Sequence, residues 1–465
     1  MQTKLKTHKW TQVASANLWK SLYFLIILGL LVACSDFVTV DLPVDQITSE
    51  TIFEDSGTAE AAVKNIYGNM RVNGMLSKVG LNAFMGLYAD ELDAYTNDGL
   101  VYQVHNIQAP NGTLLNWWNS AYNQIYAANS VIEGVGSSST LTSDERDQFR
   151  GEALFVRGYL HLLLVELFGD VPYIITTDWT VNTNVSRMPT HLVYQNIITD
   201  LEDAIELLPA TDISENKIRP NAAAAAAVLA RAYLYTQDWA NAEAASTMVI
   251  DMFGALEPDL NNVFLKDATG TIWQFVPNFE GDTADGSTFI FTSSPNYTLT
   301  NHLMDAFETN DLRRDLWVGE VANPNSTEPW YHAFKYKKRL LGGTSDEYSV
   351  QLRLAEQYLI RAEARAYQGN IPGAQADLNR IRNRAGLGDT PANTLETLLD
   401  KILDERRVEL FTEKGHRWFD LKRMGRAAEV LAPIKPGWRA TDILLPIPEA
   451  ELSLNPNLLP QNDGY

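Results

Sequence analysis

Residues 401–426 combine the apolar periodicity of a helix with a density of charge that a surface helix does not explain. The apolar positions recur at helical spacing and are Ile402, Leu403, Val408, Leu410, Phe411, Trp418, Phe419 and Leu421. The charged residues set among them are Glu405, Arg406, Arg407, Glu409, Glu413, Arg417, Asp420 and Arg423. An exposed amphipathic helix keeps its charges on one face, whereas here they alternate with Trp418 and Phe419. The segment therefore predicts charges buried as ion pairs, and Gly415 predicts a break between two helices.

The spacing of these charges has two interpretations. Glu405 and Glu409, or Glu413 and Arg417, stand four residues apart and share a helix face. A solvated salt-bridged helix would show the same spacing but would contribute little to stability. Because the charges are interleaved with large aromatic residues, we favour a structural role for the whole block over a catalytic one.

Two later segments repeat one another and predict the fold class. Ala222–Asp251 contains the sequence Ala-Arg-Ala-Tyr at 230–233, and Leu354–Asn383 contains it again at 364–367. In each segment a polar turn and a second helical pattern follow. Small residues at contact positions, an aromatic residue and a paired helix are typical of tetratricopeptide-like repeats, which must stack on neighbours to bury their faces. We therefore expect a mainly α fold in which such helix pairs form a scaffold over about 51–252 and 342–426.

The stretch between the two repeats, 253–341, has a different character. Gly, Asn, Thr, Ser and Pro are dense in it, and short alternating runs at 271–276, 289–291 and 332–336 predict brief strands. A long irregular insertion inside a packed domain is usually functional. The segment from 90 to 115 also lacks periodicity and predicts a loop. The tail at 427–465, rich in Pro and Asn, predicts extended, turn-rich chain laid over the body.

The N-terminus predicts export and lipid anchoring. Lys4, Lys6 and Lys9 form a basic N-terminal region. The apolar run Leu22–Val32 follows, is shorter than the ~20 residues of a membrane-spanning helix and is typical of a signal peptide. The run ends in Leu-Val-Ala-Cys at 31–34, which resembles the bacterial lipobox. We expect a signal peptide over 1–33, acylation of Cys34 and a tether over 34–50. The alternative is a plain anchor helix with an incidental cysteine.

Composition excludes several functions. A hydrophobic content of 45% and a charged content of 20% describe an ordinary folded protein. The net charge of −21 would repel nucleic acid, so we expect no nucleic-acid partner. The sequence contains no HExxH, GxSxG or Walker motif, and its one cysteine is predicted to carry lipid. Asp282, Asp285 and Gly286 lack the spacing of an EF-hand. We therefore expect neither an enzyme nor a cofactor or metal site.

The charged C-terminal segment also carries a family resemblance. Read from Glu405 to Gly425, the pattern E-R-R-x-E-L-x-x-E-x-G-x-R-x-x-D-L-x-R-x-G resembles the C-terminal signature of the SusD/RagB family. Members are surface lipoproteins that capture nutrients for a TonB-dependent transporter, and the signature serves them as scaffold. Arg353–Glu356, Arg361–Ala364 and the tail from Leu444 to Tyr465 also look like family positions. The resemblance implies one SusD-like domain over 51–465, anchored by lipid to the outer membrane and exposed at the cell surface.

The same resemblance implies a ligand. Family members bind oligosaccharides in loops on one face, over the mouth of a SusC-like barrel that receives them. A sugar offers apolar ring faces and hydroxyl edges, so a site needs flat aromatic rings flanked by hydrogen-bonding groups. The stacking candidates in the predicted loops are Tyr95, Tyr102, Trp273, Tyr297, Trp317 and Trp330, and the polar candidates are Asp90, Asn97 and Asn296. For each residue, ordinary packing of a loop is the competing interpretation.

Two other functions stay open from the sequence. The chain has 58 acidic residues, and two carboxylates that meet only in space could form a glycoside hydrolase. A peptide-capturing lipoprotein of the RagB type is the other alternative, because tetratricopeptide-like arrays often hold peptides. We favour capture of an oligosaccharide for delivery to the transporter because aromatic residues are frequent in the insertion.

Overall fold

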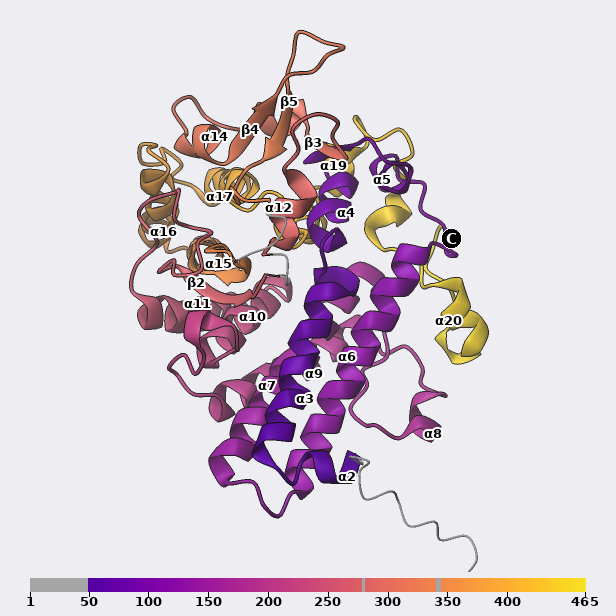
Figure 1. The fold of residues 1–465 in the computed structure, drawn as a ribbon. Helices are drawn as coiled ribbons and strands as arrows, with labels where there is room; N and C mark the ends of the chain where they lie inside the picture. The colour runs from indigo at the N-terminus through magenta and orange to yellow at the C-terminus, as the bar shows by residue number, and fades with distance from the viewer. Residues whose placement is uncertain (1–48, 278–280, 340–343) are drawn as a thin grey trace, which may run out of the picture. The chain divides into compact units, whose positions relative to one another are not determined.

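The computed structural model describes residues 49–465 apart from 278–280 and 340–343 (Figure 1). The predicted signal peptide, Cys34 and nearly all of the predicted tether lie outside the described residues. The chain from Glu50 to Tyr465 forms one unit of mutually packed elements.

Long helices packed side by side form most of this unit, which confirms the mainly α prediction. The stack is formed by α3 (Ser56–Val72), α6 (Gly112–Ser137), α7 (Ser143–Phe168), α9 (Thr190–Leu207), α10 (Ala222–Tyr235), α11 (Trp239–Phe253), α15 (Leu354–Tyr367), α16 (Ile371–Arg384) and α17 (Leu395–Glu409). α7 contacts α6 and α9, α10 contacts α9 and α11, and α15 contacts α11, α16 and α17. α15 therefore continues the stack directly from α11, although the whole insertion separates the two in sequence.

The two repeated segments form equivalent helix pairs, as predicted. Alanines at 222–227 are all buried in α10 and allow close approach of the neighbouring helices. The repeated arginine makes a cross-helix ion pair in both copies: Arg231 donates two hydrogen bonds of 2.7 Å to Glu356 in α15. Arg365 donates to Glu243 at 2.7 Å and to Asp377 at 2.8 Å. These arginines connect consecutive layers of the stack.

Shorter helical elements connect the stack and follow it. They are α2 (Ser49–Ile52), η1 (Gly74–Leu76), α4 (Gly80–Tyr88), α5 (Asn97–Gln103), α8 (Trp179–Asn182), η2 (Glu215–Lys217), α12 (Ala284–Phe289), α13 (Asn301–Met304), α14 (Leu312–Leu316), α18 (His416–Arg423), α19 (Ala427–Leu431), η3 (Ala440–Ile443), α20 (Glu449–Leu454) and η4 (Pro456–Leu458). The tail thus contains short helices between extended stretches. It contacts the end of α7, where the Leu445 amide donates to the Leu167 carbonyl at 2.8 Å.

Six short strands form three antiparallel pairs among the described residues. β1 (Leu92–Ala94) pairs with β3 (Tyr297–Leu299), β2 (Thr271–Phe275) with β6 (Ser349–Arg353), and β4 (Val318–Val321) with β5 (Trp330–Ala333). The prediction of a few short strands in the insertion is confirmed. The run at 289–291 is not a strand, because Thr283 caps α12 and the helix extends to Phe289.

The segment at 90–115 corrects another expectation. It is not a plain loop, since it holds β1, α5 and the start of α6. The Thr96 hydroxyl accepts from the Gly99 amide and caps α5. β1 exists because β3 pairs with it, and that partner comes from the insertion. Local periodicity could not show such a pairing.

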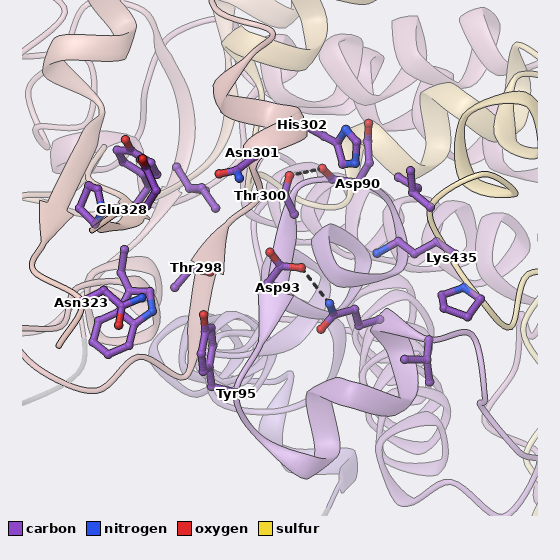
Figure 2. Close-up of a pocket in the computed structure, with 18 residues that line it drawn as sticks. Asp90, Asp93, Tyr95, Thr298, Thr300, Asn301, His302, Asn323, Glu328 and Lys435 are labelled. Carbon is purple, nitrogen blue, oxygen red and sulfur yellow. Dashed lines mark hydrogen bonds between the residues drawn. The ribbon is translucent and has the colours of Figure 1, made fainter. Parts of the chain in front are cut away.

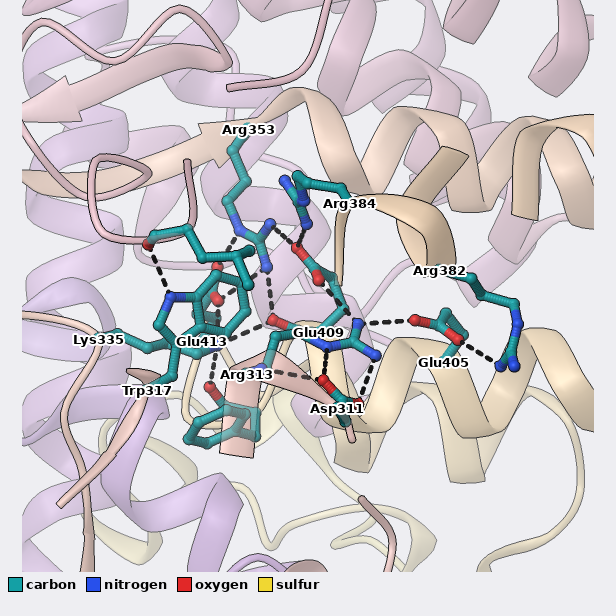
Figure 3. A network of polar contacts seen from close by, with 12 residues as sticks. Asp311, Arg313, Trp317, Lys335, Arg353, Arg382, Arg384, Glu405, Glu409 and Glu413 are labelled. Carbon is teal, nitrogen blue, oxygen red and sulfur yellow. Dashed lines mark hydrogen bonds and ion pairs between the residues drawn. The ribbon is translucent and has the colours of Figure 1, made fainter. Parts of the chain in front are cut away.

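The charged segment that opened the sequence analysis is buried, as predicted (Figure 3). We define the charge cluster as Asp311, Arg313, Lys335, Arg353, Arg382, Arg384, Glu405, Glu409 and Glu413. Glu409 lies at its centre and accepts from the guanidinium groups of Arg313, Arg353 and Arg384. Burial would raise the pKa of Glu409, but these three cations hold it well below its usual range. Gly415, at φ 74°, separates α17 and its following turn from α18.

Removing the charge of Glu409 tests this arrangement. The substitution Glu409→Gln should lower the free energy of unfolding by about 3–5 kcal/mol, because it leaves three buried guanidinium groups short of a counter-charge. Urea denaturation followed by circular dichroism measures the change.

The matched control is Glu429→Gln, which breaks an exposed ion pair with Arg426. Its expected effect is within about 0.5 kcal/mol. Equally small effects of both substitutions would contradict the central place of Glu409.

Candidate ligand-binding site

A pocket of 530 Å³ opens between β1, α5, β3, the β4–β5 hairpin and the chain that follows α19 (Figure 2). Its lining residues are Asp90, Asp93, Tyr95, Gln103, Val104, Thr298, Leu299, Thr300, Asn301, His302, Asn323, Glu328, Pro329, Trp330, Tyr331, Ile434, Lys435 and Pro436. The wall thus combines the N-terminal part of the unit, the insertion and the tail. We call it the Tyr95–Trp330 pocket.

Two aromatic rings meet at the edge of this pocket. Tyr95 is 53% exposed, directly after β1, and Trp330 is half-buried at the start of β5. Their ring centroids are 6.1 Å apart and their planes lie at 78°. Phe291 supports Trp330 from the insertion side at 6.3 Å between centroids. The Tyr95 amide donates to the Asn296 carbonyl at 2.9 Å, which fixes the backbone beneath the tyrosine. The two rings form an aromatic corner at the edge of the pocket, in which Tyr95 is exposed and Trp330 is partly exposed.

Hydrogen-bonding groups line the rest of the pocket. Gln103 donates to Asp93 at 2.8 Å, and its carbonyl oxygen accepts from the Ala94 amide at 2.7 Å. Burial raises the pKa of Asp93, and Lys435 partly opposes that shift. The ammonium group of Lys435 donates to the Leu87 carbonyl at 2.7 Å, and burial lowers its pKa to about 8. The pocket offers amide, carboxylate, ammonium and imidazole groups around an aromatic corner.

Asp90 lies at the floor of the pocket, but its carboxylate is already engaged. It accepts from Arg407 at 2.6 Å and from Arg417 at 2.8 and 3.1 Å. Burial would raise the pKa of Asp90, and the two arginines hold it below its usual range. The Asp90 carboxylate thus connects the pocket to the charged C-terminal segment, and its role as a sugar ligand stays a prediction.

Three predicted stacking residues are core residues, so their prediction as ligand platforms is wrong. Tyr102, Trp273 and Trp317 are fully buried. The Trp317 indole donates to the Leu260 carbonyl at 2.9 Å and its ring packs on Phe264. Trp273 packs edge-on against Phe155, and Tyr102 lies 4.4 Å from Phe84 between ring centroids. Their rings have no face left for a ligand.

The remaining predicted residues lie outside the pocket lining. Tyr297 is only 7% exposed in β3, which rules out an open stacking face. Asn97 is exposed at the first residue of α5, and Asn296 is exposed directly before β3. Of the nine candidates for ligand binding, the pocket brings together Asp90, Tyr95 and Trp330.

Several lining residues were missed by sequence reasoning. Asp93 had a usable signal, because it stands two residues before Tyr95 and alternate strand residues share a face. Asn301 and His302 begin α13, which starts two residues after β3 ends, and Lys435 comes from the tail. For these three, only the pairing of β1 with β3 and the fold of the tail bring them to the site. Neither the strand pairing nor the fold of the tail can be predicted from a local sequence pattern.

A second hollow of 490 Å³ lies between α6, the chain after α7 and the α20–η4 segment. Its lining is mainly apolar and consists of Trp118, Asn119, Tyr122, Asn123, Tyr126, Pro172, Ile174, Asn182, Thr183, Val185, Glu451, Leu454, Asn455 and Leu458. Leu454 is 79% exposed at its edge, and Trp179 in neighbouring α8 is 71% exposed. Tyr126, Ile175, Val181 and Leu459 are also exposed in or directly beside the lining segments. We call this surface the apolar groove.

Neither a metal centre nor a membrane span is present in the part of the chain that the structure describes. Within 49–277, 281–339 and 344–465, no three His, Cys, Asp or Glu side chains are grouped to hold a metal ion. No helix there is long and apolar enough to cross a bilayer. His161 is a core residue: its Nδ1 contacts the Arg157 carbonyl at 2.8 Å, and burial lowers its pKa to about 3.

Family models match both halves of the chain. Residues 39–234 match a family described as starch-binding and associating with the outer membrane, and residues 279–465 match the SusD family. Among curated proteins, SusD-like protein P2 of Formosa agariphila is 30% identical over 508 residues. That alignment covers 95% of this chain and 99% of the relative.

Solved structures share the fold. A laminarin-binding SusD-like protein has a TM-score of 0.77 at 24% identity, covering 89% of this chain and 100% of its own. Surface glycan-binding protein A from Bacteroides thetaiotaomicron has a TM-score of 0.75 at 20% identity, with 89% and 100% covered. The helix stack, the insertion, the buried C-terminal signature and the full-length relative agree, and the chain belongs to the SusD/RagB family.

Proposed function

We propose that this protein captures an oligosaccharide in the Tyr95–Trp330 pocket and delivers it to a SusC-like, TonB-dependent outer-membrane transporter. The observation that carries the proposal is the open aromatic corner beside a wall of hydrogen-bonding groups. A sugar ring packs its apolar face on an aromatic ring, and its hydroxyls need directional partners. The volume of 530 Å³ lies within the range of small-ligand pockets.

The capture is proposed to involve no bond cleavage. A glycoside hydrolase needs two carboxyl groups free to act on opposite sides of the bond. In the pocket, the Asp90 carboxylate is held by Arg407 and Arg417, and its pKa is lowered. Asp93 has the raised pKa that a general acid requires, but the Asp90 carboxylate is engaged by the two arginines and is not free to act as its partner. Similar solved structures include a laminarin-binding SusD-like protein and a surface glycan-binding protein, which also supports glycan binding.

Substitutions at the aromatic corner test the pocket. In the soluble protein from Ser35 onward, Tyr95→Ala and Trp330→Ala should each weaken binding to the preferred glycan roughly tenfold, or about 1.4 kcal/mol, since each removes one stacking face. A glycan array identifies the ligand, and isothermal titration calorimetry measures the affinities.

Tyr126→Ala is the matched control, because Tyr126 is similarly exposed but lies in the apolar groove. It should leave glycan affinity unchanged. If the folded protein bound oligopeptides and no glycan, the RagB-type alternative would replace this proposal.

Delivery requires a protein partner, and the apolar groove supports one. Clustered large apolar side chains that face solvent mark protein interaction surfaces. Glu451 is the only charged residue in the groove's described lining, so an anionic surface would find no basic group there. We therefore propose that the apolar groove forms part of the contact with the transporter.

The double variant Trp179→Ser with Leu454→Asp tests this surface. When the protein is co-expressed with its transporter, the yield of transporter that co-purifies should fall at least tenfold, because a charge replaces an apolar contact. Val72→Asp is the control, since Val72 is also exposed but lies at the end of α3. Unchanged co-purification of the double variant would place the contact elsewhere.

The anchor is proposed from the sequence and the family, since Cys34 lies outside the described residues. Acyl chains on Cys34 would hold the protein at the outer membrane, with the domain at the cell surface. In the native host, Cys34→Ser should release the protein from the membrane fraction and abolish incorporation of labelled palmitate. Retention of the label by the variant would show that another residue is acylated.

A further inference from the structure

One wall of the Tyr95–Trp330 pocket is a two-stranded ribbon. Asn323, Glu328, Trp330 and Tyr331 all belong to the β4–β5 hairpin or its connecting loop. Its register runs from Val318 opposite Ala333 to Val321 opposite Trp330. An isolated two-stranded hairpin is only marginally stable in water. β5 also contacts β3, and Phe291 packs on Trp330, so the position of Trp330 depends on these contacts together with those that hold the base of the hairpin.

The chain entering the hairpin is held by Arg313 in α14. This fully buried guanidinium group donates to Asp311 at 2.9 and 2.8 Å. It also lies 2.6 Å from Glu405 and 2.9 Å from Glu409, both in α17. Four residues separate Arg313 from the first residue of β4. The entry to the hairpin is thus bound to α17 through charge-assisted hydrogen bonds, which are directional.

The chain leaving the hairpin is held by Lys335, two residues after β5. Its ammonium group donates to the Glu409 carbonyl at 2.9 Å, to the Phe411 carbonyl at 2.8 Å and to the Glu413 carboxylate. It also lies 4.0 Å from the centre of the Phe411 ring. Between the two ends, the Phe334 amide donates to the Trp317 carbonyl at 2.7 Å and closes the hairpin.

The scaffold fixes the acidic partners in turn. Arg353, at the end of β6, donates to Glu413 at 2.7 Å and also pairs with Glu409, which Arg384 in α16 contacts as well. Figure 3 shows these cations converging on Glu409 and Glu413 from different elements. Glu409 and Glu413 are therefore held in place by residues outside the hairpin.

The other aromatic wall is held by the same C-terminal segment. Asp90 precedes β1 and Tyr95, and its carboxylate pairs with Arg407 in α17 and Arg417 in α18. The Thr412 amide donates to the neighbouring Glu91 at 3.2 Å. Residues 405–417 thus contact the base of both walls: acidic side chains hold the hairpin with Trp330, and arginines hold the strand with Tyr95.

We propose that Arg313 and Lys335 are positioning residues for the binding pocket, which set the place of Trp330 relative to Tyr95 through residues 405–417. A shift of the hairpin would separate these buried ion pairs and leave charges unpaired, which is costly. The ion pairs therefore favour one position of the hairpin. An apolar base of similar volume would keep the fold but allow the hairpin to slide. The effect on ligand affinity rests on the proposed function, whereas the seating of the hairpin does not.

The test compares Lys335→Met with a buried ion pair far from the pocket. Arg157→Met is the matched control, because Arg157 in α7 pairs with Asp200 in α9 within the helix stack. In hydrogen–deuterium exchange of the ligand-free proteins, Lys335→Met should speed exchange at 318–333 at least tenfold and leave α7 and α9 unchanged. Arg157→Met should do the reverse. Equal protection of 318–333 in both variants would overturn the proposal.

A double variant separates positioning from stability. Lys335→Met with Glu413→Gln removes both charges of the pair while an amide oxygen still accepts from Arg353. The melting temperature should recover towards that of the parent protein, but exchange at 318–333 should stay at least tenfold faster. Recovery of both would show that Lys335 is structural only. A melting temperature that stays low, with exchange accelerated throughout the chain, would also count against positioning.

Ligand binding provides a further readout. With laminarin oligosaccharides as the probe, or the glycan that the array selects, Lys335→Met and the double variant should bind roughly tenfold more weakly, and Arg157→Met within twofold of the parent. If the parent protein binds no glycan, the proposed function fails, but the exchange experiment still decides the positioning of the hairpin.

Discussion

The carboxylate of Glu409, buried among three guanidinium groups, is the interaction on which most of the structure depends. Arg313 comes from the insertion, Arg353 from the strand that closes it, and Arg384 from the helix stack. An unpaired charge at this depth would be far more costly than any exposed ion pair is favourable. The insertion, β6 and α16 must therefore adopt one position relative to each other for all three arginines to pair with Glu409. The charge cluster specifies how the insertion sits on the scaffold more than it adds to net stability.

The fold was largely predictable because its signals are local. The repeated Ala-Arg-Ala-Tyr segments, at 230–233 and 364–367, indicated paired helices, and both form. The mixture of Trp418 with charged neighbours indicated buried ions, and those ions are buried. These predictions succeed because periodicity and composition report on burial within one element.

The site was much less predictable because its residues come from separate elements. An aromatic residue in a Gly- and Asn-rich stretch can face solvent or core, and nothing local distinguishes Trp330 from Trp317. Trp317 is buried because Lys335 and Phe264 pack on its ring. Trp330 stays partly open because β5 directs it towards Tyr95. That difference depends on the pairing of β1 with β3 and on the contacts that hold the base of the hairpin.

Because α15 packs directly on α11, the helix stack does not depend on the length of the chain between these two helices. The antiparallel pairing of β2 with β6 brings together the two ends of the chain that lies between them, and the Leu354 amide donates to the Gly270 carbonyl at 2.8 Å. For chain whose ends are already joined, each doubling of length costs only about 0.6 kcal/mol in closure entropy. The intervening segment can therefore lengthen, shorten or be exchanged between relatives while the helices beneath remain intact. Provided that the arginine and lysine at the base of the hairpin are kept, new recognition surfaces can evolve on an unchanged frame.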